Sequence, residues 1–192
     1  GDPMKKKTGW TASVLGAAAF LAAFCLLAPR SYPVPADTTV GTRSIRYEDR
    51  PETAAEIIVA RYFLNQITGD FNEMKNLLPN TEADRITLKN EKEAFLKGES
   101  METYLIRSIT TLDREQYIGD NRAFSYPGAE HKARQENLKD YVVVHVEFYQ
   151  KWSDKAEARA PQWGSGECGR NFLVGRKALD KNYKIYDYGM MM

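Results

Sequence analysis

The feature that most constrains this chain is an uncharged, largely apolar run from Thr11 to Ala28, which follows the lysines at positions 5–7. As a helix this run would be about 27 Å long at ~1.5 Å per residue, close to the roughly 30 Å hydrocarbon core of a bilayer. Lysines that precede such a segment stay on the cytoplasmic side. The run therefore predicts a hydrophobic N-terminal helix in the membrane, with the rest of the chain on the extracytoplasmic side.

Three fates of this bacterial-type signal or anchor segment, residues 4–28, are open. Retention as an anchor suits its length, because the core of a signal peptide has only ~7–15 apolar residues. Cleavage after Ala36 would use the small residues there and release a secreted domain. Lipidation at Cys25 would make a lipoprotein, although Phe24 is bulky where such signals carry a small residue. Residues 1–3 are interpreted as a remnant of expression.

The remaining chain predicts a tether followed by one domain. Residues 29–49 are interpreted as the tether because they lack apolar periodicity and contain prolines and a glycine. Residues 50–189 are long enough for one domain with a real core. The chain before Asp37 carries a charge of +3, and subtracting this from the total of +1 leaves −2 for the remainder. A nearly neutral domain lacks the positive surface of a nucleic-acid binder.

Helices are predicted first. Thr53 and Glu56 have the spacing of a capping box, and apolar residues follow at helical intervals up to Ile67. Gly69-Asp70 should end this helix, and a second one should run from Phe71 until Pro79 stops it. Residues 91–97 predict a third, charged helix.

Strands are predicted next, at residues 104–110, 141–152, 168–178 and 183–188, the last two joined as a hairpin. Residues 119–139 and 154–166 are interpreted as polar loops. Helices followed by long strands predict an α+β fold, in which the N-terminal helices pack on one face of a curved antiparallel sheet.

Several short strings resemble the NTF2-like superfamily of α+β cones. They are Ala60-Arg61-Tyr62-Phe63, Gly69-Asp70-Phe71, Leu77-Leu78-Pro79 and the final hairpin from Tyr183 to Gly189. The likeness covers residues 50–189 and extends to uncharacterised Gram-positive membrane-anchored or lipoprotein members. It implies a cone-shaped cavity and leaves function open, since one fold hosts many functions.

Three residues are candidates for catalysis. Tyr62 stands where steroid-isomerase relatives in this superfamily carry a hydrogen-bonding tyrosine, but its required carboxylate partner cannot be assigned from sequence. His145 and Glu147 share one strand face and could act as a base and its orienter. The opposite face, from Val142 to Phe148, is wholly apolar, so His145 and Glu147 are predicted to be exposed and Tyr62 to be a packing residue.

Cofactor and metal sites are not predicted. Residues 164–169 match G-x-G-x-x-G, but a polar loop precedes them and a strand follows, whereas a dinucleotide site needs a strand and then a helix. The two histidines, His131 and His145, are far apart, and Cys168 has no neighbouring cysteine, so metal ligands are lacking.

The sequence therefore predicts a membrane-tethered extracytoplasmic domain that binds or assembles without catalysis. Its partners would be the membrane through Thr11 to Ala28, and a protein partner, a second copy of the chain or a small ligand in the cone. One alternative is an isomerase- or dehydratase-type enzyme, which needs an open apolar pocket with Tyr62 and a buried carboxylate or His145. Another is a VirB8-like component of secretion or conjugation machines. For a binding or assembly role we expect a small or filled cone and an apolar surface patch on the sheet or a helix.

Overall fold

The computed structural model describes residues 32–119 and 124–189. The hydrophobic run from Thr11 to Ala28, with its predicted cleavage, lipidation and anchoring, lies outside these residues. Within the described ranges, no helix has both the length and the apolar character that crossing a bilayer requires.

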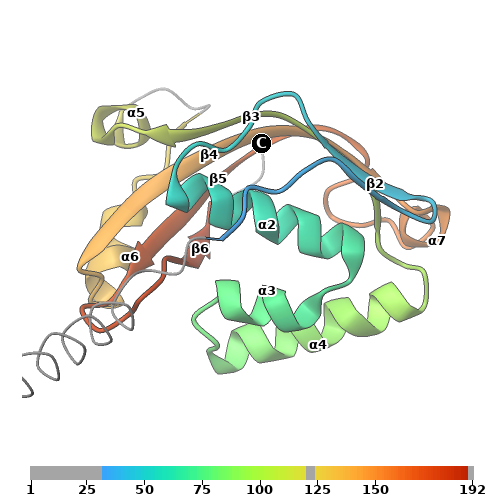
Figure 1. Ribbon diagram of the computed structural model, residues 1–192, viewed down its shortest axis with the longest axis horizontal. Helices are drawn as coiled ribbons and strands as arrows, with labels where there is room; N and C mark the ends of the chain where they lie inside the picture. Colours follow the sequence, from blue (N-terminus) through green and yellow to red (C-terminus); the bar gives the residue numbers. More distant parts are fainter. Residues whose placement is uncertain (1–31, 120–123, 190–192) are drawn as a thin grey trace, which may run out of the picture. The chain divides into compact units, whose positions relative to one another are not determined.

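The described residues form an α+β fold, as predicted, with helices packed on a six-stranded sheet (Figure 1). The strands follow one another in the order of the sequence: β1 Thr38–Val40, β2 Arg43–Tyr47, β3 Met101–Leu112, β4 Asp140–Trp152, β5 Gly166–Arg176 and β6 Lys184–Tyr188. The helices are α2 Ala54–Thr68, α3 Phe71–Leu77, α4 Glu82–Leu96, α5 Arg114–Ile118, α6 Ala129–Gln135 and α7 Asp154–Glu157. The sheet is mixed, because β2 and β3 run parallel, which corrects the expectation of a purely antiparallel sheet.

The prediction of a tether over residues 29–49 is wrong for its second half, which supplies β1 and β2. In β2, Ile45 and Tyr47 point inward and are buried, while Arg46 between them is exposed. The Tyr47 hydroxyl donates a hydrogen bond to the Ala60 carbonyl oxygen of α2, at 3.1 Å. The hairpin of β1 and β2 belongs to the sheet because β2 pairs in parallel with β3 and α2 covers its apolar side chains.

The helix α2 begins and ends as predicted, and it packs against all six strands. Thr53 and Glu56 form the capping box, and the Glu56 carboxylate also accepts hydrogen bonds from the backbone and hydroxyl of Thr111 in β3, both at 2.8 Å. Burial opposes ionisation of Glu56, but its hydrogen bonds outweigh this and lower its pKa. The capping carboxylate thus also fixes α2 on the sheet.

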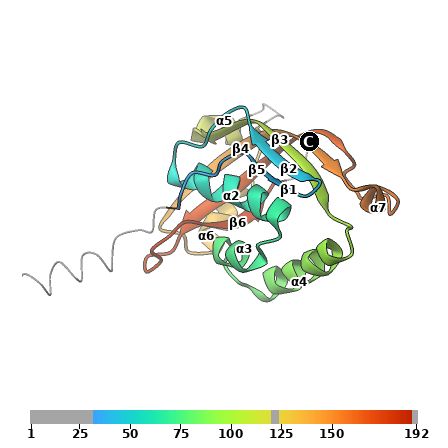
Figure 2. The same cartoon turned by 45° about the vertical axis from the view of Figure 1, so that its right-hand side comes forward.

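The helix α4 is longer than the predicted segment 91–97, since a capping box at Thr81 and Asp84 starts it at Glu82, nine residues before Glu91. It lies beyond α2 and α3 on the same side of the sheet (Figures 1 and 2). Gly69, in the left-handed region at φ 76°, joins α2 to α3, and a side chain there would collide with the ring of Phe95 in α4. The turn at Gly69 therefore holds the three helices together.

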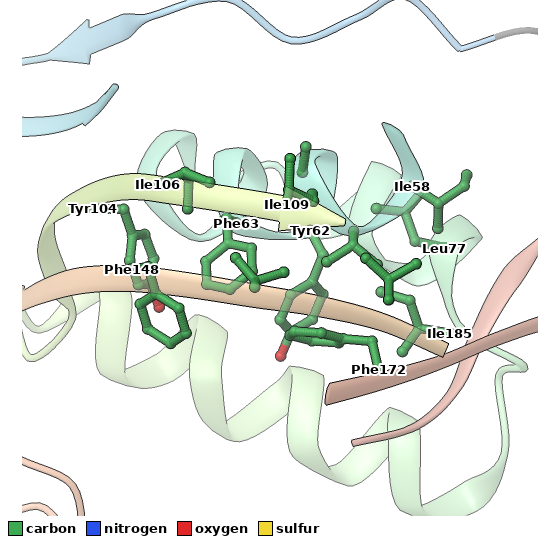
Figure 3. Packing of buried hydrophobic residues seen from close by; sticks show 14 of the residues in the cluster. Ile58, Tyr62, Phe63, Leu77, Tyr104, Ile106, Ile109, Phe148, Phe172 and Ile185 are labelled. Atoms are coloured by element: carbon green, nitrogen blue, oxygen red, sulfur yellow. The ribbon is translucent and has the colours of Figure 1, made fainter. Parts of the chain in front are cut away.

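Both faces of the sheet contribute to a hydrophobic core, the outer face only in part, since Glu147 there is exposed. On the helix side, an aromatic cluster gathers between α2 and the strands, as Figure 3 shows for Phe63, Tyr104, Phe148 and Phe172. On the other side, Val143 and Leu173 pack in a smaller core with α5 and α6. The prediction that residues 119–139 and 154–166 are loops is wrong in part, because they contain the short helices α6 and α7. The helix α6 covers β5 and β6.

Candidate functional site

A two-lobed cavity lies among α2, α4 and the strands. The first lobe has a volume of about 300 Å³ and the second a volume of about 290 Å³. The first lobe is bounded by Phe71, Ala94 and Phe95, and the second by Tyr62, Arg170 and Trp163. The two lobes share the side chains of Gln66, Glu91, Met101, Tyr104 and Trp152.

A chain of hydrogen bonds crosses the cavity wall from the sheet to α2. The hydroxyl of Tyr104, on β3, donates to Oε1 of Gln66 at 2.6 Å. Nε2 of Gln66 in turn donates to the hydroxyl oxygen of Tyr62 at 3.3 Å. Tyr62 and Gln66 are four residues apart on α2, so their side chains share one face of the helix. The geometry fixes three polar groups in a wall that aromatic rings and other polar side chains complete.

The phenols of this wall remain protonated at neutral pH. Burial raises the pKa of Tyr62 and of Tyr104 well above its ordinary value, and the carboxylate of Glu91 raises both further. Burial has the same effect on the pKa of Tyr188, on β6. These hydroxyls therefore do not take up negative charge near neutral pH, and the single proton of the Tyr104 hydroxyl is donated to Gln66.

Glu91, on α4, is the carboxylate that both lobes share. Burial raises its pKa to about 7, and the positive charge of Arg170 only partly opposes this. Within residues 32–119 and 124–189, no basic side chain lies within ion-pair distance of Glu91. Its ionisation thus changes close to neutral pH, as is common for functional carboxylates.

Arg170 faces the second lobe from β5, and its side chain is already engaged. Its Nε donates to the carbonyl oxygen of Gly189 at 3.1 Å. Its guanidinium carbon lies 4.9 Å from the ring centroid of Tyr188. The positive charge is therefore held at the wall and does not reach Glu91 as an ion pair.

Of the three residues singled out from the sequence, only Tyr62 reaches this cavity. It is buried and also packs on Phe63 and Phe172, with ring centroids 6.1 Å away in both cases. Its predicted packing role is thus confirmed, and it lines the cavity as well.

The prediction that His145 is exposed is wrong, whereas Glu147 is exposed as expected. His145 is 4% exposed, because Phe124 and the chain around α6 cover this face of the sheet. Its Nδ1 lies 2.7 Å from Oδ1 of Asn171, whose Nδ2 donates to the carbonyl oxygen of Phe124. The nearest oxygen of Glu147 is 3.9 Å from Nε2 of His145. This pair lies on the face opposite the cavity, so the structure does not bring it together with Tyr62.

In the glycine-rich stretch 164–169, Gly164 and Ser165 end a loop and the other four residues begin β5, so a loop enters a strand, as predicted. The residues just before this stretch, Pro161, Gln162 and Trp163, line the second lobe. Nε2 of Gln150 donates to the carbonyl oxygen of Gly164 at 2.8 Å, and the indole of Trp152 donates to that of Trp163, also at 2.8 Å. Cys168 is half-buried, and burial raises the pKa of its thiol, so it is not an activated nucleophile.

In the described part of the chain, no cluster of side chains matches the ligand set of a metal site. There, no three histidine, cysteine, aspartate or glutamate side chains converge as a metal ion would require.

The sequence analysis did not identify Glu91 or the residues that line the cavity with it, Gln66, Tyr104 and Arg170. A usable signal existed on α4, where Leu88, Glu91 and Phe95 follow one another at intervals of three and four residues. A charged residue within such an inward-facing row is unusual.

Comparison with known proteins found no matching family model, no matching curated protein and no matching solved structure. The function of the cavity therefore has to be inferred from its own chemistry.

Proposed function

We propose that this chain is a membrane-tethered extracytoplasmic protein whose NTF2-like domain binds a small molecule without transforming it. The observation that carries the proposal is the cavity. Each of its lobes has a volume of about 300 Å³, at the lower end of the range of ligand pockets. Its wall combines aromatic rings with polar side chains, among them Tyr104, Gln66 and Glu91, which could orient a ligand. This combination is typical of small-molecule sites.

The cone-like architecture and the location are parts of the same proposal. Helices α2, α3 and α4 lie on one face of the curved sheet, with the cavity between α4 and the strands, which is compatible with an NTF2-like cone. The uncharged run from Thr11 to Ala28 supports the membrane tether and the extracytoplasmic side.

An assembly role of the VirB8-like kind receives less support. The sequence predicts a small or filled cone for a binding or assembly role, whereas two lobes of about 300 Å³ each are present, which favours ligand binding over assembly. That role also called for an apolar patch, but the most exposed large apolar side chains are dispersed: Leu96 at the end of α4 and Leu179 in the β5–β6 turn are 75% and 97% exposed. Single exposed apolar residues of this kind are normal on protein surfaces.

Filling the cavity tests the proposal. We expect Ala94→Phe, which places a ring in the first lobe, to weaken binding of 2-phenylethanol by about tenfold or more, as loss of an apolar subsite should. Leu96→Phe, on the exposed side of the same helix, should bind like the parent chain. Isothermal titration calorimetry measures both, and circular dichroism checks that both fold. Equal binding by parent and Ala94→Phe would contradict the proposal.

A second candidate function is favoured by one observation, the raised pKa of Glu91 opposite the phenols of Tyr62 and Tyr104. A carboxylate base and a phenol that donates to a carbonyl oxygen are the parts of an isomerase- or dehydratase-type enzyme.

This enzymatic alternative predicts that the chain accelerates exchange of hydrogen for deuterium beside the carbonyl of cyclohexanone. The rate should rise as pH increases through about 7, where Glu91 becomes the ionised base. Glu91→Gln should lower it by about 100-fold or more, and NMR measures the exchange. A parent chain that gives the rate of buffer alone would rule this candidate out.

A further inference from the structure

We propose that the ligand is an organic cation, an ammonium group on an apolar body, held by the carboxylate of Glu91 among aromatic rings. This inference rests on the proposed ligand-binding function and specifies its chemical class. It follows from the balance of charge in the cavity and from the kinds of side chain that form its wall.

The charge of Glu91 is not neutralised by the protein around it. The other carboxylate of the first lobe, Glu99, forms an ion pair with Arg159 at 2.8 Å. Arg170 is engaged by Gly189 and Tyr188, as described above. In the described residues, Glu91 has no such ion pair. A half-buried carboxylate without a partner is stabilised in its charged form by a cation placed beside it.

The aromatic wall also suits a cation. Phe71, Phe95, Tyr104 and Trp152 all line the first lobe. The face of an aromatic ring attracts an ammonium or guanidinium group, and tryptophan does so most strongly. The molecule already uses this interaction here, because the guanidinium carbon of Arg43 lies 3.8 Å from the ring centroid of Phe95. An ammonium ligand would add a second contact of the same kind.

The groups that face Glu91 make its own ionisation the expected source of pH dependence near neutrality. The phenols on α2, β3 and β6 all have raised pKa values, and β5 contributes one cationic side chain; these groups are Tyr62, Tyr104, Tyr188 and Arg170. Glu99 faces the same lobe already paired with Arg159. A cation should therefore bind better above a pH of about 7 than below it, since Glu91 loses its proton there.

An anionic ligand and a neutral carbonyl ligand fit the cavity less well than a cation. An anion would meet the carboxylate of Glu91 in both lobes, whereas Arg170 lines only the second lobe and its Nε is bonded to Gly189. A neutral carbonyl compound would accept a hydrogen bond from protonated Glu91 and should bind better at low pH. The sign of the pH dependence therefore separates a cationic ligand from a carbonyl ligand.

The test compares three probes that share a phenyl body: 2-phenylethylammonium, neutral 2-phenylethanol and anionic phenylacetate. Calorimetry on the full chain in detergent gives their affinities at pH values of about 6 and about 8, on either side of the Glu91 pKa. At the higher pH the ammonium should bind about tenfold or more tightly than the alcohol, and this advantage should shrink at the lower pH.

Two variants locate the effect. Glu91→Gln should remove the preference for the ammonium while leaving alcohol binding within about threefold, which also shows that its cavity is intact. Glu93→Gln removes an exposed carboxylate of the same helix and should keep the full preference.

The outcomes distinguish this inference from the function on which it rests. Equal binding of ammonium and alcohol, or preference for phenylacetate, overturns the cationic ligand and leaves a small-molecule site. Tighter ammonium binding at the lower pH overturns the role of Glu91. Absence of binding by all three probes overturns the proposed function and this inference together.

Discussion

Phe63→Ala is expected to lower the free energy of unfolding by about 3–5 kcal/mol, the usual cost of removing a buried phenylalanine. Phe63 is 2% exposed on α2, at the centre of the aromatic cluster. Its ring centroid lies 4.8 Å from that of Tyr104 and 4.9 Å from that of Phe148, both edge-to-face. The change removes these contacts and leaves a cavity that rigid strands on one side cannot close.

Chemical denaturation followed by circular dichroism measures this loss. The matched control is Leu96→Ala, because Leu96 is 75% exposed at the end of α4 and its truncation should cost less than about 0.5 kcal/mol. Similar stabilities of the two variants would show that the cluster around Phe63 does not form the core described here.

Ile45→Ala is expected to destabilise the fold by about 2–5 kcal/mol, the range for truncating a buried isoleucine. Ile45 is fully buried on β2, opposite Tyr104 of the parallel strand β3 and Thr38 of β1. If the segment were a tether outside the domain, as its sequence indicated, the same change would cost almost nothing.

The comparison is made in one short hairpin. Val40, on β1, is 38% exposed, so Val40→Ala should change the free energy of unfolding by no more than about 0.5 kcal/mol. Denaturant titration of both variants decides the matter. If Ile45→Ala were as stable as Val40→Ala, residues 38–47 would be a tether outside the domain, and the prediction would be wrong.

Local signals explain which parts of the fold could be predicted. The start of α2 at Thr53, its end at Gly69 and the long strand β4 all depend on neighbouring residues, through a capping box, a left-handed glycine and alternating side chains. The hairpin of β1 and β2 could not be predicted in this way. Its stability depends on pairing with β3, which begins more than 50 residues later in the chain.

The burial of His145 shows a second limit. Alternation along β4 correctly separated two faces, but it could not tell that the second face is covered around His145. The apolar face, with Val144 and Phe148, packs under α2, and the other face lies under α6 and Phe124. Which face is exposed depends on what the rest of the chain places over it, and the prediction for His145 was therefore wrong.

The sequence by itself determined the α+β class, the boundaries of α2 and α3, and the run from Thr11 to Ala28 as the basis for expecting a membrane tether. These follow from interactions between residues close together in the chain. Only the tertiary structure decided that residues 38–47 belong to the sheet and that Glu91 meets Tyr104 and Tyr62 in one cavity. The physical reason is that burial, charge and pKa depend on neighbours in space. For Glu91 those neighbours come from α2 and three strands far apart in sequence.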